Sequence, residues 1–444
     1  MIEGIDSRLA NRILWGLLFG AVAGGATLLV GGIYPDLLPA ARQFATIVLD
    51  PLGQVFLRML FFVVIPLVFA SLAMGVAQLE RLTQLGPLAT RTFLLFFVNM
   101  SIAVALGMVM MNVLQPGAAM DPEARSNLLA EYGGAAQQHI EKRAAQPAVT
   151  PMTVVEMFMP RNLFGAFVGN NRDALGDVLP LILFAILVGA AAVSLSRERR
   201  DQLRSGLGLI TDLMTRIVHF ALSIAPYAVP AMIYSVIVKI GWDIVIALGA
   251  FVLGCIFVML LHLFGTMSLW LKLLAGRRPV EFWSQIRPVL VTAFSTSSSA
   301  ATLPTALAIA REPLRVRPSV AGFVLPLGTT MNMAGTALYE GCVVLFVAQV
   351  FGIDLSFAQQ LTLLLLAVLS AVAVAAIPGG SLPLIAGLLA SFGIPPEGIG
   401  IILGVDRILD MTRTMVNVGA DVVTAVVVDR HTKLDAAGQG VPVS

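Results

Sequence analysis

Charge is scarce in this sequence. Only 12% of its 444 residues are Asp, Glu, Lys or Arg, whereas 58% are hydrophobic. Soluble domains carry roughly a quarter of charged residues. The mean hydropathy is +0.89, so we expect a membrane protein rather than a soluble globular one. The net charge of +2 gives no basis for binding nucleic acid.

Residue types that build metal and redox sites are also rare. The two cysteines, Cys255 and Cys342, lie in apolar stretches, and the four histidines are scattered, with no CxxC motif or His/Cys cluster. We interpret the cysteines as small buried hydrophobic residues. The sequence contains no nucleophile–base pair, metal cluster or phosphate loop that would indicate an enzyme, and it indicates no cofactor.

Long apolar stretches dominate instead, and eight of them can cross a bilayer as helices of about 20 residues. They are 13–33, 47–78, 88–115, 178–196, 207–238, 243–273, 318–350 and 398–428. The first follows a short segment of mixed charge and has no cleavage-site pattern, so we expect a retained helix rather than a signal peptide. The sequence therefore predicts an all-α protein that spans the membrane many times.

Two further apolar stretches are interrupted at their middle. Segment 280–312 carries hydroxyls from Ser295 to Ser299, and segment 359–393 contains Pro378 and Gly379. Each is either a kinked span or a re-entrant hairpin that enters and leaves on one side. Irregular backbone at membrane depth is tolerated where it lines a cavity or is buried in protein, and paired broken helices mark substrate sites in transporters.

The basic residues favour two hairpins. With hairpins, the clusters Arg197–Arg204 and Arg311–Arg317 fall on the same side as most other loop Arg and Lys residues, and the side rich in these residues is cytoplasmic. Two full spans would instead place the cluster Arg311–Arg317 outside. We therefore predict two re-entrant hairpins and cytoplasmic termini. The polar segment 117–150 would lie outside, and we assign it no function.

The last span holds the strongest functional signal. Asp406, Asp410, Arg413, Asn417 and Asp421 fall within a sector of roughly 80° on a helix with about 100° per residue. They form a polar stripe on an otherwise apolar helix. Charges at this depth usually serve ion or substrate handling. The alternative is a salt-bridge network that only joins helices, but this stripe exceeds what packing needs.

The chemistry of the stripe suits a zwitterion with an acidic side chain. Arg413 offers a planar fork for a carboxylate, and Asp410, one turn away, can accept an ammonium group. Asn417 can donate to a second carboxylate, and half-helix N-termini would add backbone donors. Arg407 lies beside the stripe, and we interpret it as a structural partner of Asp406.

The preceding span supplies ligands for cations. The stretch from Gly328 to Thr336, with its Gly and Thr residues, interrupts it, and an unwound helix exposes the carbonyl groups that sodium favours. Asp421 adds a hard carboxylate oxygen. Farther along the span, Glu340 lies among apolar residues of the sequence, and loss of hydration there favours the neutral form of its carboxyl group. It is either a proton carrier or a neutral hydrogen-bonded group of the core.

These motifs together resemble the signature of the glutamate transporter family, the dicarboxylate/amino acid:cation symporters. The matching stretches are Ser298-Ser299 with Ala301-Thr302-Leu303-Pro304, Asn332-Met333-Ala334-Gly335-Thr336, Pro378-Gly379, and the pattern from Asp406 to Asp421. They occur in order, and the resemblance covers residues 1–430. It implies secondary active symport of aspartate or glutamate, coupled to protons, sodium or both, by a homotrimer in the bacterial inner membrane.

The resemblance also implies an elevator mechanism with two domains. The first, second, fourth and fifth spans would form a scaffold that holds the trimer, and the remaining spans and both hairpins would move as one rigid transport domain. The scaffold would comprise 1–78 and 178–241, the transport domain 79–116 and 242–430, the extracytoplasmic loop with the start of the fourth span 117–177, and the cytoplasmic tail 431–444.

Carried over by matching position, the resemblance implies a substrate site. Arg413 and Thr336 would hold the side-chain carboxylate of the substrate. Asp410 would accept its ammonium group, and Asn417 would donate to its α-carboxylate. The other residues that would line the site are Thr414, Ser297, Ser298, Ser299, Ile377, Pro378 and Gly379.

The resemblance further implies sites for the coupled cations. Asp421 would bind one sodium ion together with carbonyl groups of Gly328, Asn332 and Asn417. A second sodium ion would use Thr330, Met331 and carbonyl groups of the outer hairpin at 371–374. Glu340 occupies the position of the proton acceptor in proton-coupled members.

The sequence departs from the family pattern at a third, deep sodium site. The usual Asn-Met-Asp-Gly-Thr has Ala334 in place of the aspartate, and Phe96, Asn99 and Met100 replace the expected tyrosine, threonine and serine. Because a lost carboxylate removes the charge partner of a cation, we predict that this site is absent. With Glu340 present, the changes favour proton coupling with fewer sodium ions.

The sequence is compatible with several functions of this family. Arg413 favours an acidic over a neutral amino acid, and Asp410 disfavours a plain C4-dicarboxylate, which has no ammonium group to pair. The alternatives are a C4-dicarboxylate or neutral amino acid symporter of the same family, or an anion channel on this fold. A channel would conduct without saturable, cation-coupled uptake. The sequence does not separate aspartate from glutamate or sodium from proton coupling.

Overall fold

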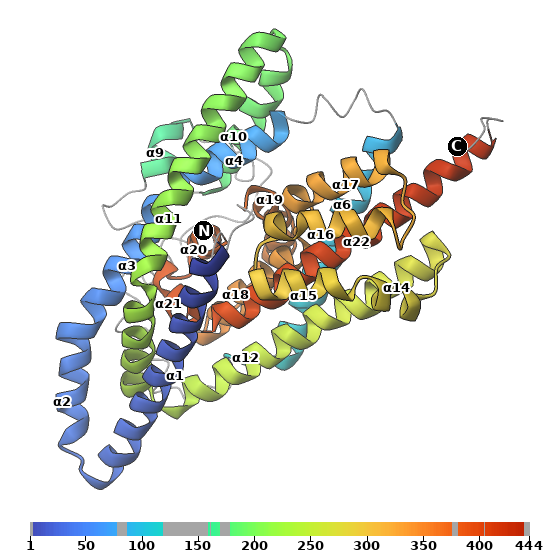
Figure 1. The fold of residues 1–444 in the computed structure, drawn as a ribbon. Helices are drawn as coiled ribbons and strands as arrows, with labels where there is room; N and C mark the ends of the chain where they lie inside the picture. The colour runs from blue at the N-terminus through green and yellow to red at the C-terminus, as the bar shows by residue number, and fades with distance from the viewer. Residues whose placement is uncertain are drawn as a thin grey trace.

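The computed structural model describes residues 3–77, 87–118, 159, 161–168, 178–374, 381–403 and 405–438. Throughout these residues the secondary structure is helical and contains no strand (Figure 1). The all-α prediction is therefore confirmed for the described chain. Most of the predicted loop 117–177 lies outside these residues, as do Ile377, Pro378 and Gly379 of the second predicted hairpin.

A first group of helices packs mainly against its own members. It consists of α1 (Glu3–Ile33), α3 (Asp50–Phe62), α4 (Val64–Ala77), α10 (Val178–Val193) and α11 (Arg197–Ile240). The short α2 (Leu37–Phe44) and η1 (Ala45–Leu49) connect α1 to α3. Lys239 and Ser235 of α11 donate to the carboxylate of Asp50, each at 2.6 Å. These bonds fix α11 against α3 on the flank where Figure 1 shows α1, α2, α3 and α11.

A second group is built around the last helix. Its long helices are α6 (Pro87–Leu114), α12 (Trp242–Leu260) and α22 (Asp406–Gly438), and α12 continues through η2 (Leu261–Thr266), α13 (Met267–Trp270) and η3 (Leu271–Ala275). Between them in the chain lie α14 (Pro279–Gln285), α15 (Arg287–Thr296), α16 (Ser299–Arg311), α17 (Pro318–Met331), α18 (Ala334–Val350), α19 (Phe357–Ala373), α20 (Leu382–Ser391), η4 (Pro396–Gly398) and α21 (Ile399–Leu403). The short α9 (Leu163–Val168) lies against α10 of the first group.

Two of the predicted interruptions are present in the described chain, and the third, at Pro378 and Gly379, lies outside it. α15 ends at Thr296 and is followed by Ser297, which has a left-handed backbone with φ of +50°. Ser298 caps α16 by accepting a hydrogen bond from the Ala301 N–H at 3.2 Å. α17 and α18 are separated by Asn332 and Met333. α15, α16, α17 and α18 all pack against α22. The broken segments therefore surround the helix that carries the polar stripe, as Figure 1 shows for α15, α16 and α18.

Four helical stretches of the described chain are long and apolar enough to cross a membrane. In Pro87–Leu114 and Ile244–Ala275, only 39% of the most apolar window is buried, but the buried share is 94% in Pro318–Val350 and 89% in Asp406–His431. The helices that carry the predicted polar residues are thus enclosed by protein. The total of eight spans and the re-entrant course of the hairpins stay predictions.

Candidate functional site

Arg413 of α22 is held by two carboxylates. Its Nε and Nη2 atoms donate to Asp410 Oδ1 at 2.9 and 2.8 Å, and Nη1 donates to Asp406 Oδ1 at 3.2 Å. Tyr339 of α18 donates its hydroxyl to the same Asp406 oxygen at 2.9 Å, and the guanidinium lies 4.7 Å from the centre of the Tyr339 ring. All four side chains are buried. We call these residues, together with Arg407, the Arg413 network.

The predicted partner of Arg407 is wrong. Its Nη1 atom lies 3.7 Å from Asp410 Oδ2, while the Asp406 carboxylate bonds to Arg413 and Tyr339. Residues three apart on a helix face each other, whereas adjacent residues point in different directions. Arg407 therefore adds a second cation beside Asp410, and the two Arg and two Asp side chains of the network balance each other.

The start of α18 lies directly against the stripe. Asn417 Oδ1 accepts hydrogen bonds from the Gly335 and Thr336 N–H groups at 2.7 and 3.3 Å, and Asn417 Nδ2 donates to Thr336 Oγ1 at 3.1 Å. A Cβ atom at position 335 would overlap the Arg413 carbonyl oxygen, so this approach requires glycine. The fold thus brings Thr336 and Asn417 together one turn from Arg413, as the prediction needs.

The serines of the first broken segment also reach this region. Ser297 and Ser299 are buried where α15 and α16 pack on α22. The Ser297 hydroxyl has no hydrogen-bond partner within the described chain, whereas Ser298 is used as the cap of α16. Thr414 donates back to the Asp410 carbonyl at 2.8 Å. Ser297 is therefore a buried polar group available to a ligand, while Thr414 is satisfied locally.

Asp421 lies about two turns beyond Arg413 on α22. It is beside the interruption between α17 and α18. Its Oδ1 atom accepts a hydrogen bond from Asn332 Nδ2 at 2.8 Å, and its buried Oδ2 atom has no hydrogen-bond partner among the described residues. A Cβ atom at Gly328 would overlap the carboxylate. Gly328 and Asn332 therefore lie against Asp421, although the Gly328 carbonyl accepts from the Asn332 N–H at 3.0 Å and the use of carbonyl groups as sodium ligands stays a prediction. A carboxylate oxygen with open lone pairs beside an interrupted helix suits a small cation.

The residues predicted for the second sodium ion are placed differently. Thr330 is exposed and donates to the Leu327 carbonyl at 3.1 Å, whereas Met331 is buried. α17, which carries both, packs against α19, and α19 leads into the segment 371–374. This site stays a prediction.

Glu340 is fully buried in α18. The Ser370 hydroxyl of α19 lies beside its carboxyl group, and the described residues offer that group no other hydrogen-bond partner. Thr336, Tyr339 and Glu340 follow at helical spacing on one face of α18. Sequence reasoning named Thr336 and Glu340 but missed Tyr339, although this spacing was the signal that marked it.

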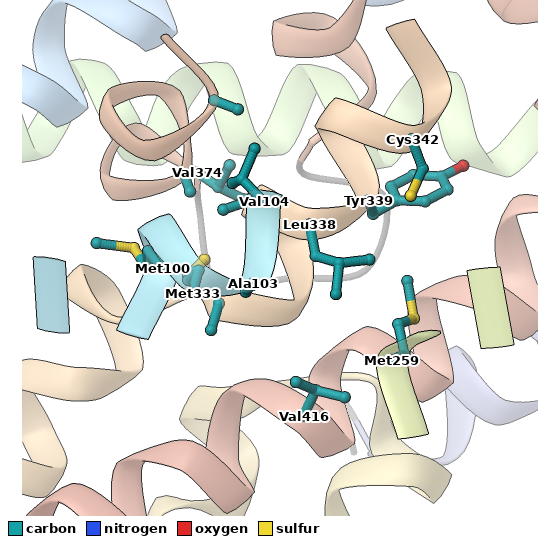
Figure 2. Packing of buried hydrophobic residues seen from close by; sticks show 14 of the residues in the cluster. Met100, Ala103, Val104, Met259, Met333, Leu338, Tyr339, Cys342, Val374 and Val416 are labelled. Atoms are coloured by element: carbon teal, nitrogen blue, oxygen red, sulfur yellow. The ribbon is translucent and has the colours of Figure 1, made fainter. Parts of the chain in front are cut away.

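Apolar side chains fill the region assigned to a third sodium ion. Phe96, Met100 and Ala334 are buried, and Figure 2 shows Met100 beside Met333. Asn99, the polar residue of this stretch of α6, donates through Nδ2 to Asn332 Oδ1 at 2.9 Å. The absence of the third site stays a prediction, but the structure assigns Asn99 a partner that the sequence did not indicate.

A known family of proteins matches the part of the sequence that contains these site residues. The model of the family described as the sodium:dicarboxylate symporter family matches residues 9–431. The chain belongs to this family. It is 32% identical over 434 residues to the proton/sodium-glutamate symport protein of Bacillus subtilis, with 97% of this chain and 94% of the relative covered. The predicted family is confirmed, and the chain is a multi-pass membrane transporter rather than an enzyme.

Other relatives carry different cargo names. The chain is 30% identical over 420 residues to the proton/glutamate-aspartate symporter of Escherichia coli, with 94% and 92% of the two chains covered. It is also 30% identical over 411 residues to the C4-dicarboxylate transport protein of Deinococcus radiodurans, with 91% and 86% covered. Relatives of this chain are therefore named for different cargoes, and membership of the sodium:dicarboxylate symporter family does not by itself specify the cargo.

Proposed function

We propose that this protein is a secondary active symporter of acidic amino acids, aspartate or glutamate, coupled to sodium, protons or both. The observation that carries the proposal is the Arg413 network, a buried guanidinium shared by two carboxylates and lying one turn from Asn417. The names of the relatives from Bacillus subtilis and Escherichia coli support the same cargo.

Substrate binding is an exchange of partners within this network. The side-chain carboxylate of the substrate takes the donors of Arg413 that bond to Asp410 in this structure. Asp410 then accepts the ammonium group, while the second N–H of the Asn417 amide and the N-terminus of α16 meet the α-carboxylate. Asp410 thus exchanges one cationic partner for another, whereas the α-carboxylate meets only neutral donors and leaves one net negative charge for the coupled cations to balance.

The coupled cations bind beside the substrate. Asp421, with carbonyl groups of Gly328, Asn332 and Asn417, holds a sodium ion, and Glu340 carries a proton in its neutral form. A second sodium ion uses Thr330 and Met331. Each cation offsets part of the negative charge of the acidic substrate, which links their movements.

Movement follows the division into two groups of helices. The first group forms a scaffold that holds a homotrimer, and the second group, with both hairpins, moves as a rigid elevator. Both termini lie in the cytoplasm, and the protein resides in the bacterial inner membrane. The packing of each group mainly within itself supports this division.

A C4-dicarboxylate is the alternative cargo, favoured by the name of the relative from Deinococcus radiodurans. Such a substrate would displace Asp410 from Arg413 without offering an ammonium group. Asp410 would then lose its bonds to Arg413 and gain no cation in exchange, with the Arg407 guanidinium 3.7 Å away. Loss of a buried partner costs about 3–5 kcal/mol, so we expect the amino acid to bind more tightly.

The cargo is tested by uptake of radiolabelled L-aspartate and L-glutamate into proteoliposomes, with succinate and L-alanine as competitors. We expect saturable uptake that succinate and alanine inhibit weakly. In Asp410→Asn, the preference for aspartate over succinate should fall, since the ammonium partner is lost. Stronger inhibition by succinate than by unlabelled aspartate would contradict the proposal, and conductance without saturable uptake would indicate a channel.

A further inference from the structure

Three hydrogen bonds in series run from the continuation of α12 to α22. His262 Nε2 lies 3.0 Å from Asn99 Oδ1, Asn99 Nδ2 donates to Asn332 Oδ1 at 2.9 Å, and Asn332 Nδ2 donates to Asp421 Oδ1 at 2.8 Å. All four side chains are buried, with exposed fractions of 0–1%. We call them the Asp421 chain. It joins η2, α6, the α17–α18 interruption and α22.

The direction of these bonds is fixed by the carboxylate at the end. An ionised Asp421 only accepts, so Asn332 must present its NH₂ group to it and its oxygen to Asn99. Asn99 must then present its NH₂ group to Asn332 and its own oxygen to His262. His262 therefore carries a hydrogen on Nε2, and every donor in the chain points toward Asp421.

This alignment prepares the carboxylate for a cation. Hydrogen bonds in series polarise one another in a medium of low dielectric constant, and here each donor stabilises negative charge on Asp421. The chain also occupies Oδ1 and leaves the buried Oδ2 without a partner within the described chain. It holds Asn332 in one side-chain orientation at the point where α17 ends and α18 has not begun.

We propose that His262 and Asn99 are positioning residues for cation binding at Asp421. They touch neither the cation nor the substrate. They hold Asn332, and through it the Asp421 carboxylate, in the arrangement that receives the ion. The inference rests on the proposed role of Asp421 as the cation ligand.

Substitutions at His262 separate positioning from proton transfer. The amide nitrogen of Gln reaches about as far as Nε2 of His and donates a hydrogen bond, but it does not titrate at physiological pH. Met fills similar volume without a donor. We therefore expect His262→Gln to keep the sodium affinity of the wild type within about threefold and His262→Met to lower it about three- to tenfold, the effect of one buried hydrogen bond.

Asn99→Leu removes the middle residue of the Asp421 chain, so it should lower sodium affinity at least as much as His262→Met. The matched control is Asn112→Leu, the same change on the same helix. Asn112 bonds to Gln360 and the Met108 carbonyl and does not belong to the Asp421 chain. At saturating sodium, all four variants should keep the KM for aspartate within about threefold of the wild type, since a merely disordered protein would lose both affinities.

The experiment measures sodium dependence in two ways. One is the sodium concentration for half-maximal aspartate uptake in proteoliposomes, and the other is the sodium-dependent rise in Tm of the purified protein without substrate. Wild-type sodium affinity in both His262→Met and Asn99→Leu would overturn the inference. So would a His262→Gln variant that matches His262→Met and loses proton-driven uptake, since His262 would then act by titration.

The wild type distinguishes this inference from the proposed function. If sodium affects neither its uptake nor its Tm, the role of Asp421 as cation ligand fails, and the positioning role fails with it. If the wild type responds to sodium and the Met and Leu variants respond equally, only the positioning role fails.

Discussion

Two polar clusters lie along α22, and they handle charge in opposite ways. In the Arg413 network, two carboxylates, Asp406 and Asp410, pair with two guanidinium groups. In the Asp421 chain, the carboxylate receives a hydrogen bond from a neutral amide, and its second oxygen has no partner in the described part of the chain. The first cluster is balanced within itself, whereas the second carries a charge that an added cation would balance.

The difference separates two kinds of binding. A charge at the bilayer centre costs about 2.5–3.5 kcal/mol on insertion scales, so each cluster needs compensation. A balanced network binds a zwitterion by exchanging partners, while a lone carboxylate binds by adding an ion. Positions 413 and 421 are about 12 Å apart along the helix axis. The proposed substrate and cation sites therefore lie on neighbouring but distinct parts of α22.

Removing the centre of the balanced cluster should have the largest effect. Arg413→Thr leaves Asp406 and Asp410 without their shared cation and takes away the fork for the substrate carboxylate. We expect the affinity for aspartate to fall by about 100-fold or more, the effect of about 3 kcal/mol. Uptake of aspartate in proteoliposomes measures it. Lys239→Met, which breaks the Asp50 pair of the first group, is the control and should keep wild-type affinity.

Neutralising the lone carboxylate should affect the cation instead. In Asp421→Asn the shape is kept but the charge is lost, so we expect sodium affinity to fall about tenfold or more while aspartate still binds at high sodium concentration. A sodium titration of aspartate uptake gives both quantities. Unchanged half-saturation by sodium would show that the ion binds elsewhere.

Crowding the same carboxylate tests geometry without altering charge. In Gly328→Ala the new methyl group would overlap the Asp421 carboxylate, and overpacking of this kind costs about 1–3 kcal/mol, so sodium affinity should fall about tenfold. Gly322→Ala on the same helix is the matched control, because its nearest neighbour would be an Arg311 nitrogen at an ordinary 3.8 Å. Equal sodium affinity in the two variants would refute close contact at Gly328.

Glu340 belongs to neither cluster and should show the smallest effect on sodium. Glu340→Gln keeps the shape and removes the titratable proton, so uptake driven by a proton gradient should fall and its pH profile should flatten, with sodium affinity unchanged. Measurement of uptake against external pH tests this. If proton-driven uptake and its pH profile match the wild type, Glu340 is a structural group.

The sequence predicted the elements whose signals are local. The helical period placed Asp406, Asp410, Arg413, Asn417 and Asp421 on one face, and the structure buries all five. The hydroxyl run and the Gly-Thr stretch predicted the interruptions found at Ser297–Ser298 and Asn332–Met333. Each of these features depends only on residues near one another in the chain.

Of the partners far apart in the chain, only those that the family resemblance implies, such as Asn332 with Asp421, were predicted. The bonds from Tyr339 to Asp406 and from His262 to Asn99 join different helices, and no spacing in the sequence indicates them. Helix ends also differed, because α11 begins at Arg197 rather than near 207. An apolar stretch in the sequence matches only the hydrocarbon core of the bilayer, whereas a helix can continue through the polar residues that precede the stretch.

Binding of radioactive sodium to the purified wild type, Arg413→Thr and Asp421→Asn tests the separation of the two clusters most directly. The account predicts that sodium still binds to Arg413→Thr without substrate and that its binding is lost in Asp421→Asn. Loss of sodium binding in Arg413→Thr together with retention in Asp421→Asn would contradict it.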